Sequence, residues 1–165
     1  MSAIPRPPNG KTWRETFRRG LVSGAIASVV SAAALALCGR LEGGTAGGPL
    51  NGPSQWLFGR RAARRRSASP RHTFAGYAIH HVAATWWAVV HETLFGRTNG
   101  RADPLQVLRE AAATAAIACV VDYRLTPKRL QPGFEQQLTR TSLVVAYAAF
   151  ALGLALGRAR EHSRG

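Results

Sequence analysis

The chain has 165 residues, a formal net charge of +14 at pH 7 and a pI of about 11.6. That length excludes two large hydrophobic cores and suggests one domain. The charge favours a polyanionic partner, either nucleic acid or an anionic lipid surface. The charges are segregated, because four blocks contain no Asp, Glu, Lys or Arg: residues 20–39, 73–90, 111–121 and 141–157. A soluble amphipathic helix would carry a charge on its outer face about once per turn, and these blocks do not.

The N-terminal region, residues 1–19, is polar and basic, and its three prolines predict a flexible start. The first apolar segment, 20–39, is long enough to cross a bilayer at about 1.5 Å of rise per residue. A signal peptide is the alternative interpretation, but the apolar run is longer than a typical signal core. Small residues recur every four positions in this segment, a spacing that lets another helix approach closely in lipid: Gly20, Gly24, Ser28 and Ala32.

Residues 40–72 are predicted to be a loop in two parts. The first part is so rich in Gly and Pro that we expect no regular structure, and no GKS or GKT follows it to make a phosphate loop. The second part could begin a short helix at Ser54. It places an aromatic residue beside an arginine cluster, which suits lipid headgroups, RNA or a merely solvated surface. Beside membrane-length segments we favour lipid headgroups, with these contact residues: Trp56, Arg60, Arg61, Arg64, Arg65 and Arg66.

The second apolar segment, 73–95, carries four ionisable residues: His80, His81, His91 and Glu92. His80 and His91 are eleven residues apart, as are His81 and Glu92, and eleven residues are close to three helical turns. All four therefore lie on one narrow face, which in a bilayer must point at protein or at water.

Three roles suit this polar face. Its side chains could hydrogen-bond to residues of other helices, such as Thr114, Tyr147 or Ser142, and fix the bundle. They could respond to or conduct protons, since histidine titrates near neutral pH. A metal site is the least favoured role, because the two outer histidines lie about 16 Å apart along the axis.

The third segment has a clear helix start, with Asp103 as N-cap and Pro104 at the first helical position. It should run to about Leu125 and stop before Pro127. Glu110 lies about 9 Å from this start, either at headgroup depth or facing the bundle.

The fourth segment, 139–157, is the most apolar, and Arg158 and Arg160 are predicted to end it. It carries a second stripe of small residues: Ala149, Gly153 and Gly157.

The pieces "RRGLVSGAIAS", "HHVAATWWAVVHETLF" and "DYRLTP" resemble, in this order, the YagU-like family of small bacterial inner-membrane proteins. That family shows a basic start, a glycine-bearing first span, a His-led aromatic span ending in Glu-x-x-Phe, and a third span ending in Leu-Thr-Pro. The resemblance implies a location in the bacterial inner membrane and a helical bundle. It implies no reaction.

Together these features predict an all-α, multi-pass integral membrane bundle of about four transmembrane helices, at approximately 20–39, 73–95, 104–125 and 139–157. Residues 20–157 should form one membrane domain between the basic start, 1–19, and a basic tail, 158–165. No GxSxG or catalytic-cysteine pattern is present. We therefore expect no enzyme, no cofactor and no metal.

The expected partners are the lipid bilayer and its anionic headgroups. The small-residue stripes are also compatible with a homo-oligomer. Three functions follow in order of preference. The first is a structural or accessory membrane bundle. The second is a pH-responsive or proton-conducting protein that uses the polar face of the second helix. The third is a soluble basic protein that binds nucleic acid, which is the less favoured partner.

Overall fold

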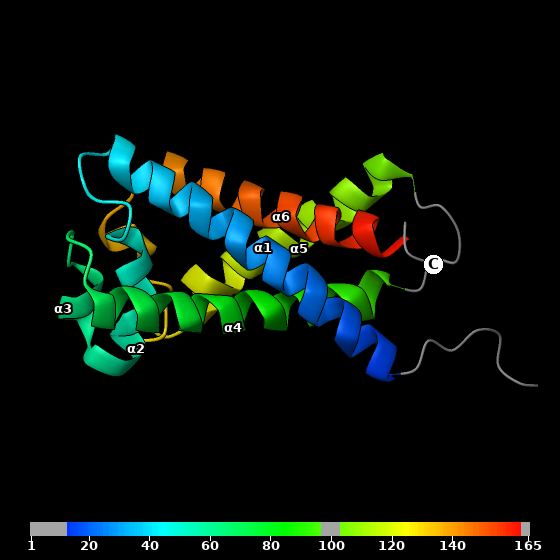
Figure 1. Cartoon of the computed structure of the whole chain (residues 1–165), viewed down its shortest axis with the longest axis horizontal. Coiled ribbons are helices and arrows are strands. Elements are labelled where there is room, and N and C mark those ends of the chain that lie inside the picture. Colours follow the sequence, from blue (N-terminus) through cyan, green and yellow to red (C-terminus); the bar gives the residue numbers. More distant parts are fainter. Residues whose placement is uncertain (1–12, 97–102, 163–165) are drawn as a thin grey trace, which may run out of the picture.

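The structure is a computed structural model, and it describes residues 13–96 and 103–162. Within these ranges every regular element is a helix, which confirms the all-α class (Figure 1). Four long helices make up the bundle: α1 (Trp13–Leu41), α4 (Pro70–Phe95), α5 (Pro104–Val120) and α6 (Arg140–His162). A π-helical turn, η2 (Val121–Leu125), continues α5, so the third segment ends where the sequence predicts.

Helix α1 is the centre of the bundle. It packs along α4 on one side and along α6 on another, and α5 packs against α6. We call the end where α1 and α5 begin the terminal end, and the end where α4 and α6 begin the loop end (Figure 1). Helices α4 and α5 lie against each other over only a short stretch.

The interior of the bundle consists largely of small side chains, several of them polar, whereas many large apolar side chains are exposed on its outside. On α1, Ser28 and Ser31 are 0% and 2% exposed, whereas Val29 and Leu37 are 57% and 59% exposed. Water would favour the opposite arrangement. Lipid tails solvate a leucine as well as another leucine does, so helices in lipid bury small and polar residues instead. This distribution is therefore typical of a bundle that lies in a membrane.

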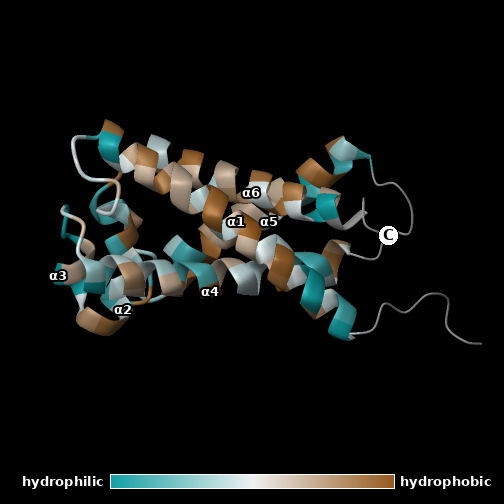
Figure 2. Cartoon of the chain, viewed as in Figure 1, coloured by the Kyte–Doolittle hydropathy of each residue, from teal (hydrophilic) through white to brown (hydrophobic). Residues whose placement is uncertain are grey.

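Among residues 13–96 and 103–162, three helical segments are long and apolar enough to cross a membrane: Trp13–Leu41, Pro104–Leu125 and Arg140–Arg160. The other long helix, α4, is not among them, so the predicted count of four spans is not confirmed. Figure 2 shows the same contrast, with hydrophobic colours along the long helices, hydrophilic colours at both ends, and hydrophilic patches along α4.

Two predicted boundaries are wrong. The flexible basic start does not extend to residue 19, because α1 begins at Trp13 and Glu15 pairs with Arg19 one turn later at 2.6 Å. The last helix does not end at Arg158 but continues to His162. Both errors come from reading a basic residue as the end of a span, although a helix can extend beyond the apolar core.

The segment after α1 is also more regular than its glycine and proline content predicts. It forms a 3-10 helix, η1 (Pro49–Ser54), followed by two short helices, α2 (Gln55–Phe58) and α3 (Arg60–Ala63). Helix α2 starts one residue after the predicted position at Ser54. The expectation of no regular structure before it is wrong.

Polar side chains hold η1 in its buried place, because a buried backbone must have hydrogen-bond partners. The amide of Asn51 donates to the carbonyls of Arg65 and Ser67 at 2.7 and 3.0 Å, and its oxygen accepts from Thr73 at 2.7 Å. Gly76 of α4 leaves room for η1, since an added Cβ would lie 1.9 Å from the carbonyl oxygen of Leu50.

The first turn of α6 is capped by Glu42, the residue that follows α1. Glu42 accepts hydrogen bonds from the Thr139 backbone N–H at 3.0 Å, from the Thr139 hydroxyl at 2.7 Å and from the Ser142 hydroxyl. The hydrogen bonds from Ser142 and then Thr139 lower the pKa of Glu42 below its ordinary value. The ionised carboxylate also suits the partial positive charge of a helix N-terminus.

Small residues set the distance between α1 and α4. A Cβ on Gly24 would lie 2.6 Å from the Cα of Thr85, and one on Gly20 would lie 2.8 Å from the Cα of Val89. Real Cβ atoms essentially never come this close to a backbone atom. The predicted stripe on α1 therefore faces α4, and its last member, Ala32, is buried.

The stripe on α6 faces α1. A Cβ on Gly153 would lie 2.4 Å from the Cα of Ala27, and one on Gly157 would lie 2.5 Å from the Cα of Ser23. Ala149, one turn before Gly153, is half-buried. Helix α1 thus makes a close approach to a neighbour on each of two faces.

We expect Gly153→Leu to destabilise the bundle, because the new side chain would collide with the backbone of α1. Overpacking of this kind costs roughly 1–3 kcal/mol or more. The matched control is Ala148→Leu, which adds a similar side chain at an exposed position of α6. Unfolding followed by circular dichroism in mixed detergent micelles measures both, and equal stability of the two variants would contradict the close packing.

Candidate functional site

The three histidines predicted on one face of α4 contact two different helices, and Glu92 beside them is buried. Near the loop end, His80 is hydrogen-bonded to Ser31 at 3.0 Å and His81 to Ser28 at 3.1 Å, both on α1. Near the terminal end, His91 and Glu92 are buried. The face therefore points into the bundle, and its two halves belong to separate groups of side chains.

The partners of the first two histidines were not among those considered from the sequence. Ser28 belongs to the small-residue stripe, and Ser31 lies three residues further along α1. Once α1 and α4 are known to pack through that stripe, serines beside it become the natural partners. The stripe itself contained the signal, a serine among small residues, but its spacing in the sequence predicts only space for close packing.

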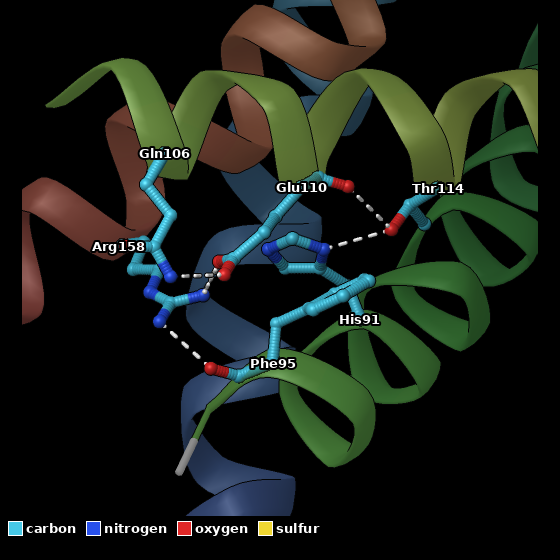
Figure 3. Close-up of polar contacts among 6 residues, drawn as sticks. All are labelled: His91, Phe95, Gln106, Glu110, Thr114 and Arg158. Carbon is cyan, nitrogen blue, oxygen red and sulfur yellow. Dashed lines mark hydrogen bonds and ion pairs between the residues drawn. The ribbon is translucent and has the colours of Figure 1, made fainter. Parts of the chain in front are cut away.

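His91 is the buried centre of the second group, shown in Figure 3. Its Nδ1 lies 2.8 Å from the hydroxyl of Thr114 on α5, one of the partners suggested by the sequence. The Thr114 hydroxyl donates to the carbonyl of Glu110 at 3.1 Å, so it can only accept from His91. We therefore place the proton of the neutral ring on Nδ1. Nε2 then carries a lone pair, and it has no hydrogen-bond partner among the described residues.

An ion pair completes this group. Arg158 of α6 donates to the Glu110 carboxylate of α5 at 2.7 Å, and their side chains are only 3% and 14% exposed. The same guanidinium donates to the carbonyl of Phe95 at the end of α4 at 2.7 Å, and Gln106 donates to Glu110 at 3.0 Å (Figure 3). One arginine thus joins the terminal ends of three helices.

The place of Arg158 corrects the sequence prediction, which assigned it to the basic tail. Its position could have been read from the spacing on α6, because Phe150, Leu154 and Arg158 follow one another every four residues. All three are buried. Glu110 accordingly faces the bundle, which is one of the two positions predicted for it.

Chemically, the group around His91 offers one lone pair beside a neutralised pair of charges. The charges of both Arg158 and Glu110 act on the ring. A metal ion would need more ligands than this single nitrogen. Within residues 13–96 and 103–162 no three His, Cys, Asp or Glu side chains lie close enough together to hold one.

The arginine cluster lies at the loop end, as Figure 1 shows for α2 and α3. The six residues predicted to contact headgroups are all exposed: Trp56, Arg60, Arg61, Arg64, Arg65 and Arg66. Leu57 is also exposed, so residues 56–66 expose aromatic, aliphatic and basic groups. Such a mixture suits the level of lipid headgroups, and contact with them stays a prediction.

Comparison with protein-family models, curated proteins and solved structures finds no match for the chain. Membership of the YagU-like family therefore stays a prediction.

We expect Arg158→Gln to lower the free energy of unfolding by about 3–5 kcal/mol, because it leaves the Glu110 carboxylate buried without its partner. Arg140→Gln, the same change at an exposed position of α6, should cost less than about 1 kcal/mol. Stability in detergent measures both. Adding Glu110→Gln to Arg158→Gln should recover part of the loss, and equal costs for the two arginine variants would contradict the role of the ion pair.

Proposed function

We propose that the chain is a multi-pass protein of the bacterial inner membrane. It acts as a structural or accessory helical bundle without catalytic chemistry of its own. The distribution of side chains on α1 carries this proposal, because Ser23, Ser28 and Ser31 are buried while Val29 and Leu37 of the same helix are exposed. The three long apolar helices support it as well.

Helix α4 is the fourth span in this proposal. It has 26 residues, or about 39 Å at 1.5 Å per residue, which exceeds the thickness of a bilayer core. Its histidines at positions 80, 81 and 91 face α1 and α5, where they have hydrogen-bond partners, while Val82, Trp86 and Leu94 are exposed. A polar helix of this kind can cross a membrane when its neighbours satisfy its side chains. The histidines of the inward face then contribute to its low hydropathy.

Anionic lipid headgroups are the partner that suits the loop end. The exposed arginines of α3 and the residues after it would meet the negative surface of a leaflet, worth about 1 kcal/mol per basic residue near that surface. Trp56 beside them would anchor at the same depth. The membrane thus supplies the polyanionic surface that the charge of +14 favours.

Alkaline carbonate extraction tests the proposal. We expect a tagged protein to stay in the membrane pellet after carbonate and after high salt, because its spans are embedded in lipid. Single cysteines at Ser67 and Asp103, on a background lacking Cys38 and Cys119, should then be labelled from opposite sides of the membrane.

Two results would contradict the proposal in different ways. Release into the carbonate supernatant would show that the protein is not integral to the membrane. Salt-sensitive binding of nucleic acid would then become the preferred function. Labelling of both cysteines from the same side would leave the protein in the membrane but show that α4 does not cross it.

A pH-responsive or proton-conducting protein is the second candidate, and it is favoured by Nε2 of buried His91, which has no hydrogen-bond partner in the described part of the chain. A proton could bind there, beside Glu110 and Arg158. In this case His91→Gln in liposomes should slow the decay of a pH gradient between pH 5 and 7, and His72→Gln, at the loop-end start of α4, should not. Identical decay in wild type and both variants would rule this candidate out.

A further inference from the structure

A cavity of about 480 Å³ opens in the loop-end half of the bundle. It lies between α4 and the end of α5, and the segment from Leu130 to Phe134 closes it toward the loops. Its volume falls within the range of about 300–1,000 Å³ that is usual for small-molecule sites. Because α4 and α5 adjoin each other only briefly, a molecule dissolved in the lipid could reach the cavity between them.

The walls of this cavity are apolar and rich in aromatic rings. Six aromatic side chains line it: Trp56, Trp86, Trp87, Phe134, Tyr147 and Phe150. The faces of such rings attract cations, and the attraction strengthens away from water.

One carboxylate, that of Asp122, also lines the cavity. It accepts a hydrogen bond from the Tyr147 hydroxyl at 2.6 Å, and no ion pair of Asp122 occurs among the described residues. No lysine or arginine belongs to the lining. Asp122 lies in the π-helical turn η2, and turns of this kind are frequent at functional sites.

His80 also belongs to the lining, and its ring is hydrogen-bonded to Ser31 of α1 at 3.0 Å. The Ser31 hydroxyl donates to the carbonyl of Ala27 at 2.7 Å, so His80 Nε2–H must donate to Ser31. The neutral ring then has its lone pair on Nδ1. Asp122 is thus the acidic side chain of the lining, and its carboxylate suits a positively charged ligand.

We propose that this cavity binds a lipophilic organic cation, with its apolar groups against the aromatic walls and its positive charge beside Asp122. An ionised carboxylate in apolar surroundings is costly unless a counter-charge accompanies it, and the ligand supplies that charge. A fatty acid or a phospholipid phosphate would instead be repelled. This activity goes beyond a structural role, and it uses neither the His91 group nor the arginine cluster.

The test uses the purified full-length protein in detergent and two ions of the same shape, tetraphenylphosphonium and tetraphenylborate. Equilibrium dialysis and tryptophan fluorescence measure their binding. We expect saturable binding of the phosphonium and much weaker specific binding of the borate. Asp122→Asn should weaken phosphonium binding by about tenfold or more, since it removes the counter-charge from a low-dielectric site.

Two further variants separate charge from folding. Asp103→Asn removes a carboxylate at the opposite end of α5, outside the cavity, and asparagine still caps the helix, so phosphonium binding should be unchanged. Asp122→Glu keeps the charge and should retain most of the binding. Circular dichroism shows whether each variant folds.

Equal binding of both ions by the wild-type protein would overturn the proposal without any variant. It would show that the cavity accepts apolar molecules, such as lipid acyl chains, whatever their charge. Undiminished phosphonium binding by folded Asp122→Asn would overturn it as well.

Discussion

The structure depends on the close approach of α1 to α4 and α6 at the same time. In lipid, apolar side chains gain little by leaving the solvent, so helices associate where they pack more closely than lipid can and where they form hydrogen bonds. Gly24 and Gly153 permit such an approach, because any side chain there would meet a neighbouring backbone. The same approach brings the serines of α1 within hydrogen-bond distance of His80 and His81. Packing and polar contacts therefore have one origin.

Much of the fold could be predicted because its signals are local. The four uncharged blocks mark the long helices, the Asp-Pro pair marks the start of α5, and Pro127 marks the end of the turn that follows it. The inward face of α4 follows from helical periodicity, and Thr114, which His91 contacts, is one of the three partners suggested for that face. These features depend on spacing within one segment, or on the rule that polar groups in lipid must face protein or water.

The rest depends on contacts between distant segments. Arg158 has the sequence context of a residue that ends a span, and only its pairing with Glu110, 48 residues away, places it in the interior. Glu42 caps a helix that begins almost a hundred residues later, and η1 is ordered by Asn51 through carbonyls of a later loop. In each case a polar group is satisfied by a partner whose position is fixed by tertiary structure. No pattern within the segment indicates it.

The two ends of the bundle treat their carboxylates differently, and this contrast bears on function. At the terminal end the charge of Glu110 is neutralised by the buried side chain of Arg158. Burying an ion without a partner would cost several kcal/mol. At the loop end Asp122 accepts one hydrogen bond from a hydroxyl and forms no ion pair within the described ranges, although exposed arginines occur in α3 and the residues after it at the same end. A bundle that only needed stability could place an apolar residue there. A carboxylate kept in an aromatic cavity without an internal counter-charge is better explained by a cation that comes from outside.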